Sequence, residues 1–140
     1  MIDINRQKSQ QQTISNSIEI SGIGLHSGLE INLKIEKAPV DNGIKFIRTD
    51  SNCENIINAL WSNVSSTNLC TTISNGFNLS VSTIEHLMSA LSGLHIDNAN
   101  IYINGPEVPI MDGSSKPFVN LIEEDGIEIQ NKKRKILKIK

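Results

Sequence analysis

The sequence predicts an α+β fold, a two-layer sandwich in which two helices cover one face of a single, mostly antiparallel sheet. Several short segments alternate apolar and polar residues with a period of two, as half-buried strands do. Two other segments carry helix signals instead, namely apolar residues at helical spacing in one and a cap followed by proline in the other. One sheet and one pair of helices account for both patterns.

The chain is expected to begin with strands after a polar leader. Residues 1–11 are polar and rich in glutamine, which predicts a disordered leader. Residues 14–20 and 29–36 alternate apolar and polar side chains and are predicted as two strands. The glycines between them lack dinucleotide-binding spacing and lead into a strand, so we exclude a phosphate-binding loop there.

Further strands are predicted on both sides of the first helix. A turn at residues 41–43 precedes the next one, because Asp-Asn-Gly favours a tight reversal. The predicted extended segments are residues 44–49, 55–60, 71–73 and 99–104.

The first helix is predicted just after Ser82. The apolar residues at helical spacing are Ile84, Leu87, Met88, Leu91 and Leu94. Ser82 and Glu85 fit a capping box, in which Glu85 would reach back to the Ser82 amide. His86, Ala90 and Gly93 fall on a different face, so we expect His86 to point away from the main core and beneath a neighbouring segment or domain. If exposed, the small residues of that face would favour self-association.

The second helix is predicted from its end signals. Asp112 or Ser114 can cap its first turn, Pro117 suits that turn, and Gly126 should end it. A role for Asp112 in a functional site is the alternative to capping.

Basic residues gather at the C-terminal end. Six of the 13 are Lys132, Lys133, Arg134, Lys135, Lys138 and Lys140. No aromatic residue or amphipathic helical pattern accompanies them, so we expect no nucleic-acid partner. Apolar residues alternate with these lysines, which predicts that residues 129–140 form a basic edge strand or the crossover to a second domain. Residues 12–128 then form the main domain.

Composition is consistent with one domain that has an aliphatic core. The chain has 140 residues, 4% aromatic residues and a net charge of −2. No apolar run is long enough for an integral membrane segment. The polar N-terminus also lacks the apolar core of a signal peptide, so we predict a cytoplasmic location. Cys53 and Cys70 lack metal-type spacing and are expected to be free thiols in that reducing compartment.

Glu85 and His86 are the strongest candidates for chemistry. A carboxylate next to an imidazole can supply a general base and a metal ligand to one small volume, as zinc-dependent hydrolysis requires. The alternative is a capping glutamate beside a surface or hydrogen-bonded histidine. These two residues alone leave both interpretations open.

Four further segments accompany residues 82–87 (Ser-Thr-Ile-Glu-His-Leu). They are residues 23–28 (Ile-Gly-Leu-His-Ser-Gly), 68–72 (Asn-Leu-Cys-Thr-Thr), 93–98 (Gly-Leu-His-Ile-Asp-Asn) and 106–114 (Pro-Glu-Val-Pro-Ile-Met-Asp-Gly-Ser). In this order they resemble the N-terminal half of the UDP-3-O-acyl-N-acetylglucosamine deacetylases, zinc amidases of lipid A and hence lipopolysaccharide biosynthesis. The resemblance runs from about Gln12 to near the C-terminus and implies the first of two related two-layer domains, with the active site between them.

The resemblance also implies roles for individual residues. Glu85 would be the general base and His86 a zinc (Zn²⁺) ligand. Leu69 and Cys70 would contact the substrate, a UDP-sugar that carries an acyl chain. His26 would face the mouth of the site, although a turn histidine in water explains that residue equally well.

Part of the family's site is missing from the sequence. Its other metal ligands come from a His-x-x-x-Asp motif, and none of the histidines here, His26, His86 and His95, has an aspartate four residues later. Those ligands, the general acid histidine and the active-site lysine are expected in a C-terminal half. We therefore expect the chain alone to be inactive. The alternatives are an inert truncated fragment, one subunit of a split enzyme whose C-terminal half is a separate polypeptide, or, with less support, an RNA-binding module.

Overall fold

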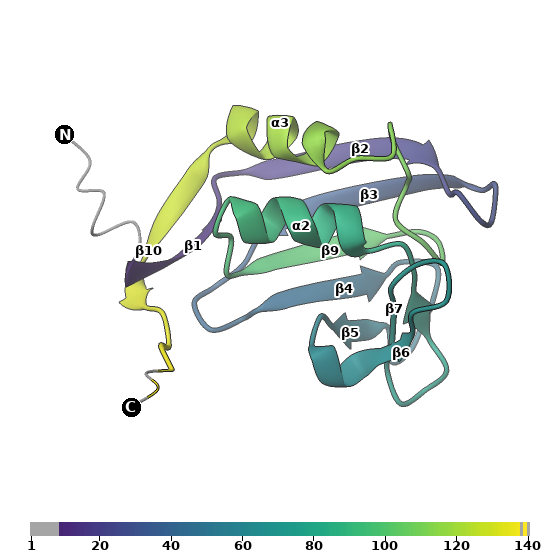
Figure 1. The fold of residues 1–140 in the computed structure, drawn as a ribbon, viewed down its shortest axis with the longest axis horizontal. Helices are drawn as coiled ribbons and strands as arrows, with labels where there is room; N and C mark the ends of the chain where they lie inside the picture. The colour runs from purple at the N-terminus through teal and green to yellow at the C-terminus, as the bar shows by residue number, and fades with distance from the viewer. Residues whose placement is uncertain (1–8, 138, 140) are drawn as a thin grey trace.

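The computed structural model describes residues 9–137 and 139, and it confirms the two-layer α+β architecture (Figure 1). Its main layer is a five-stranded sheet in which every neighbouring pair is antiparallel except β4 and β9, which run parallel. In spatial order the strands are β2 (Ser17–Ile23), β3 (Glu30–Lys37), β9 (Ala99–Ile103), β4 (Ile44–Arg48) and β5 (Ile56–Asn58). Each overlaps a segment predicted to be extended.

Two helices form the second layer, α2 (Glu85–Gly93) and α3 (Lys116–Asp125). They contact each other on one face of the main sheet (Figure 1). The apolar face of α2 buries Leu87 and Leu91, and that of α3 buries Phe118 and Ile122. Alternate residues of β3 complete the core from the sheet side, because a strand turns every second side chain to the same face. None of the helices in the described part of the chain has the length and apolarity needed to cross a bilayer.

Two small sheets flank the sandwich. One consists of β1 (Gln10–Ile14) paired with β10 (Ile127–Lys133). The other contains β6 (Val64–Ser66), β7 (Thr72–Ser74) and β8 (Ser80–Val81), and the one-turn 3₁₀ helix η1 (Trp61–Asn63) precedes it. In Figure 1 these two sheets lie at opposite ends of the molecule.

The predicted leader is too long, because β1 begins at Gln10. Gln11 is only 5% exposed, and its side chain is held from two directions. Its Nε2 donates to Asp41 Oδ1 at 2.8 Å, while its Oε1 accepts from the Asp41 amide and from Asn98 Nδ2. A buried glutamine is tolerated here because its amide group is hydrogen-bonded. Residues 1–8 lie outside the described residues.

The single strand predicted for residues 14–20 is divided between β1 and β2. The Ser15 amide donates to the Gly126 carbonyl, and the Asn16 amide donates to Asp125 Oδ2, both at 3.0 Å. These bonds turn the chain so that β1 leaves the main sheet and pairs with β10. The alternation lapses at this point, where Ser15, Asn16 and Ser17 are three consecutive polar residues, and the prediction wrongly continued one strand across them.

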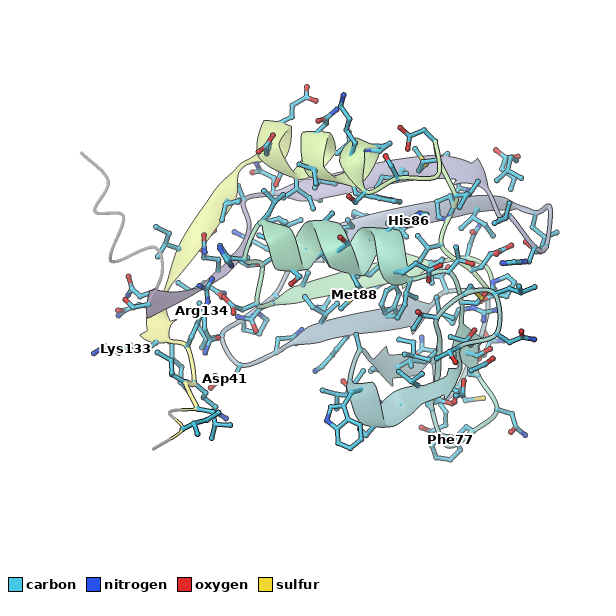
Figure 2. The ribbon with its side chains drawn as sticks, in the orientation of Figure 1. Asp41, Phe77, His86, Met88, Lys133 and Arg134 are labelled. Atoms are coloured by element: carbon cyan, nitrogen blue, oxygen red, sulfur yellow. The ribbon has the colours of Figure 1, made fainter. Side chains whose placement is uncertain are left out.

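The C-terminal edge strand lies earlier than predicted. β10 pairs only with β1 and ends at Lys133, whereas residues 134–137 form no strand. Lys132 forms an ion pair with Asp41, and Arg134, which is labelled in Figure 2, forms one with Asp97 at 2.9 Å. Lys138 and Lys140 lie outside the described residues. The division of the chain into a main domain and a crossover stays a prediction.

The second helix follows its predicted signals with one change. Asp112 Oδ1 accepts hydrogen bonds from the amide and hydroxyl of Ser114, and Ser114 Oγ accepts one from the Lys116 amide. Asp112 therefore orients Ser114, but neither is the N-cap as predicted: the N-cap of α3 is Ser115, whose side chain makes no capping bond. Pro117 lies in the first turn, and α3 ends before Gly126, whose φ of 96° is accessible to glycine.

The face of α2 that carries Ala90 is not open. Ala90 is 1% exposed and belongs to the hydrophobic core, whereas Gly93 at the end of the helix is exposed. The predicted self-association through this face is therefore wrong for Ala90. The small side chain permits close packing within the sandwich instead.

Candidate functional site

The turn into α2 is the point where most of the motif segments meet. The Ser82 amide donates to the Pro106 carbonyl at 2.9 Å, and the Val108 amide donates back to the Ser82 carbonyl at 3.0 Å. The Ile110 amide bonds to the Ile23 carbonyl at the end of β2. The segment of residues 106–114 therefore connects the end of β2 to the start of α2.

Glu85 is the first residue of α2, but it does not form the predicted capping box. Its Oε2 accepts a 3.0 Å hydrogen bond from the Thr71 amide. The Ser82 amide is occupied by Pro106, and the N-cap residue Ile84 makes no side-chain capping bond. No other described residue hydrogen-bonds to the Glu85 carboxylate. Its Oε1 therefore accepts no hydrogen bond from the described residues.

His86 follows Glu85 on the first turn of α2 and is half-buried (Figure 2). Its imidazole has no hydrogen-bond partner among the described residues. A ring nitrogen is thus free to act as a ligand. Within residues 9–137 and 139, however, no group of three His, Cys, Asp or Glu side chains is placed to hold a metal ion. A metal at His86 would need ligands from outside the described residues.

Glu107 is a buried charged residue at the same place. It is 1% exposed, and its carboxylate accepts hydrogen bonds from the Ser27 amide at 2.6 Å, the His26 amide at 3.0 Å and the Thr83 hydroxyl at 3.1 Å. Burial raises the pKa of the Glu107 carboxyl, but the hydrogen bonds from Ser27, Thr83 and His26 outweigh it and hold the pKa below its ordinary value. Glu107 is therefore a stable carboxylate.

His26 lies in the exposed loop between β2 and β3, and Glu107 holds the backbone of that loop. Gly24 packs so closely on Glu107 that a Cβ at this position would collide with the carboxylate and with the Ser27 hydroxyl. Only glycine fits there. The loop that carries His26 is thus fixed against the segment that leads into α2.

Leu69 and Cys70 come immediately before Thr71, the residue that bonds to Glu85. Leu69 is 86% exposed and adopts a φ of 63°, and Cys70 is half-buried with its Sγ 3.7 Å from Thr72 Oγ1. Leu69, two residues before the Glu85 contact at Thr71, therefore offers exposed apolar surface to a ligand. Cys53 lies elsewhere and is exposed, and neither cysteine forms a disulfide.

Residues 93–98 are the motif segment that lies apart from this site, at the other end of α2. Asp97 Oδ2 accepts from the Gln12 amide and pairs with Arg134, while Asn98 Oδ1 accepts from the Gly43 amide at 2.9 Å. These contacts attach the β1–β10 sheet to the sandwich. This segment has a structural role in the described fold.

Seven non-glycine residues of the described chain have positive φ values, and three of them lie in the converging segments. Leu69, Thr83 and Met111 have positive φ values of 63°, 55° and 54°. Such a conformation costs a β-branched residue the most, so Thr83 is the clearest outlier. Strain of this kind is common where side chains are held for function.

Two residues of this site, Glu107 and Thr83, were not singled out by the sequence. A glutamate between Pro106 and Val108, in an otherwise apolar segment, was a signal for a buried charge. The conformation of Thr83 had no sequence signal, because it depends on a partner 24 residues away.

A groove of about 630 Å³ lies on the opposite face of the main sheet from the helices. Polar side chains of β2, β3 and β9 line it, among them Glu19, Lys34 and Tyr102. None of its lining residues belongs to the five motif segments. The groove is therefore separate from the candidate site.

Comparison with known proteins agrees with the motif segments. Residues 11–140 match the family model for UDP-3-O-acyl N-acetylglycosamine deacetylase. The UDP-3-O-acyl-N-acetylglucosamine deacetylase of Shewanella pealeana is 46% identical over 129 residues, which cover 92% of this chain and 42% of that protein. The one from Shewanella sp. strain ANA-3 is 47% identical over 130 residues, 93% of this chain and 42% of that protein. The chain thus spans less than half the length of these relatives, and it belongs to the UDP-3-O-acyl N-acetylglycosamine deacetylase family.

Proposed function

We propose that this chain is the N-terminal half of a zinc-dependent amidohydrolase that removes the N-acetyl group from UDP-3-O-acyl-N-acetylglucosamine in lipid A biosynthesis. One observation carries the proposal: four of the five motif segments meet at the start of α2, where Glu85 and His86 are adjacent. Deacetylation is the activity named for relatives that are 46–47% identical to this chain.

In this proposal Glu85 is the general base. Its carboxylate takes a proton from the attacking water, whose oxygen bonds to the acetamide carbonyl carbon. The C–N bond then breaks, the nitrogen leaves as a protonated amine, and acetate is released. The Thr71 hydrogen bond occupies Oε2 and fixes the orientation of the carboxylate, so Oε1 is the oxygen placed to accept the proton.

His86 would supply one imidazole ligand to the metal. Bound zinc lowers the pKa of a water molecule and polarises a carbonyl oxygen, which is the chemistry this hydrolysis requires. The donor set supports a partial fit, because His86 has a free imidazole beside a carboxylate but no second or third ligand among the described residues. We therefore propose that a C-terminal half supplies the remaining ligands and that the chain alone is inactive.

The substrate would lie across the segments that surround this helix turn. Leu69 and Cys70 are two residues and one residue, respectively, from the Glu85 contact at Thr71, and His26 lies in the loop held by Glu107. We assign these three residues to substrate binding. The two free thiols support a reducing compartment, and hence a cytoplasmic location.

The experiment is an acetate-release assay on UDP-3-O-acyl-N-acetylglucosamine with added zinc. The purified chain is tested alone and after mixing with the C-terminal region of the Shewanella pealeana deacetylase, and association of the two polypeptides is verified by light scattering. Activity that appears only after the two polypeptides are mixed supports the proposal. Activity of the chain alone would contradict the ligand count, and an associated but inactive mixture would favour an inert fragment.

The RNA-binding alternative has little support from the structure. Of the clustered basic residues, Lys132 is paired with Asp41 and Arg134 with Asp97. Charges that are paired within the fold are less available to phosphates. A steep dependence of RNA binding on salt concentration would be needed to revive this alternative.

A further inference from the structure

Glu107 is a buried carboxylate. It is neither the general base nor a metal ligand in the proposed function. Three hydrogen-bond donors converge on it, the amides of His26 and Ser27 and the hydroxyl of Thr83. No described acidic or basic side chain forms an ion pair with it. A buried charge without a counter-ion is costly unless hydrogen bonds replace its hydration, and here they do.

These donors belong to two separate segments that carry candidate site residues. His26 and Ser27 lie in the loop after β2, whereas Thr83 is two residues before Glu85 and three before His86. One carboxylate therefore bonds at once to the loop of His26 and to the turn that starts α2. The backbone bonds between Ser82 and residues 106 and 108 hold Glu107 itself in register with that turn.

The Thr83 bond has a particular consequence for the helix start. Thr83 is 2% exposed and has a φ of 55°, an unfavourable conformation for a β-branched residue. The next residues, Ile84 and Glu85, begin the helix, so the direction in which α2 leaves the turn depends on this conformation. The Glu107–Thr83 hydrogen bond offsets part of its cost.

Building on the proposed function, we propose that Glu107 is a positioning residue of the deacetylase site. Through the Thr83 hydroxyl it fixes the backbone from which Glu85 and His86 project, and through the His26 and Ser27 amides it fixes the loop of His26 relative to them. Its role is to set the geometry between two segments, without contact with the reacting atoms.

The test compares substitutions of two buried threonines. The comparison separates a positioning role from a general contribution to stability. Thr83→Val removes the hydroxyl that bonds to Glu107 and keeps the branched shape. Thr13→Val is the matched control, because Thr13 is 1% exposed and its hydroxyl is hydrogen-bonded too. That hydroxyl donates to the Asn98 carbonyl and accepts from the Ala38 amide. Both variants should lose stability. Thr83→Ser restores the hydroxyl and should restore the native behaviour.

The main measurement is the NMR spectrum of the chain itself, recorded below the melting temperature of every variant. Thr83→Val should shift the His86 imidazole and Glu85 amide signals while the Ser27 amide stays near its native position. Glu107→Ala should shift the His86 and Ser27 signals together. Thr13→Val should leave all of them unchanged. If Thr83→Val moves the His86 signals no more than Thr13→Val does, or if Thr83→Ser does not restore them, the proposal is wrong.

Activity of the mixed halves gives a second readout. Thr83→Val should lower kcat roughly 10–100-fold, as the loss of a group that orients a metal ligand does, with little change in KM. Thr13→Val should leave kcat unchanged, and an equal loss in both variants would contradict positioning. If the unsubstituted mixture has no activity, the proposed function fails, and the NMR comparison still decides whether Glu107 sets the helix start.

Discussion

The backbone amide of Thr71 and Oε2 of Glu85 are joined by a 3.0 Å hydrogen bond. This bond attaches the segment with Leu69 and Cys70 to the first turn of α2. Because only a main-chain N–H holds the carboxylate, any residue other than proline at position 71 with the same backbone conformation would do so equally well. The orientation of the candidate base therefore depends on the fold of residues 68–72 and not on a second catalytic side chain.

Glu85→Gln should leave the fold intact and abolish most of the activity. The glutamine oxygen can still accept the Thr71 hydrogen bond, but an amide cannot take a proton from water. We expect turnover of the mixed halves to fall roughly 10²–10⁴-fold, with zinc still bound. The matched control is Glu123→Gln on the exposed side of α3, which should retain full activity. Undiminished turnover in Glu85→Gln would refute the base assignment.

His86→Ala should weaken zinc binding without unfolding the protein. Because the imidazole makes no hydrogen bond within the described residues, its loss should change the metal-free free energy of unfolding by less than about 1 kcal/mol. Zinc affinity of the mixed halves, measured by calorimetry, should fall by more than roughly tenfold.

The control for that experiment is His95→Asn. His95 is exposed and has a φ of 60°, a conformation that asparagine tolerates. The mixture that contains His95→Asn should bind zinc with the same affinity as the unsubstituted mixture. Equal zinc affinity in His86→Ala and His95→Asn would remove His86 from the ligand set.

Glu107 should make the stability of the chain depend on acid pH. Its pKa is lowered in the folded state, so its contribution is present above the unfolded value of about 4.3 and is lost as the pH falls through the folded pKa. Glu107→Gln should be less stable than the unsubstituted chain at pH 7, and the difference should shrink below about pH 4. Urea unfolding at a series of pH values measures this. Parallel curves would show that the charge of Glu107 contributes nothing.

Gly24→Ala should disrupt the loop that carries His26. The added methyl group would collide with the Glu107 carboxylate and the Ser27 hydroxyl, and crowding of this kind typically costs about 1–3 kcal/mol. Gly93→Ala is the control, since its Cβ would meet open space at the end of α2, and it should be neutral or more stable by up to about 1 kcal/mol. Thermal melts of the two variants compare these costs directly. Equal melting temperatures would mean that the loop can move to accommodate the added methyl group without loss of stability.

The sequence predicted best those elements whose pattern is local. The alternation of residues 29–36 corresponds to β3, and the helical spacing after Ile84 corresponds to α2. The break between β1 and β2 was missed, because it depends on Gly126 and Asp125 at the other end of the chain. Periodicity carries no information about partners so distant in sequence.

The candidate site was predictable in content but not in arrangement. Glu85 and His86 were singled out as a pair, yet the local capping box assigned Glu85 the wrong partner. Its actual partner, Thr71, is 14 residues earlier. Resemblance named the segments that matter, and the hydrogen bonds of Glu107 show how three of them are joined.

The pairing of β1 with β10 sets a condition on the order of folding. Ile14 lies opposite Ile127, so 113 positions separate two residues that share one ladder (127 − 14 = 113). At about 5–20 residues per second, a ribosome needs roughly 6–20 s to make the intervening chain. During that interval the first strand has no partner, and its glutamine-rich edge offers little apolar surface to another chain. Closure of the β1–β10 sheet is therefore a late step in synthesis, after the residues of both helices have been made.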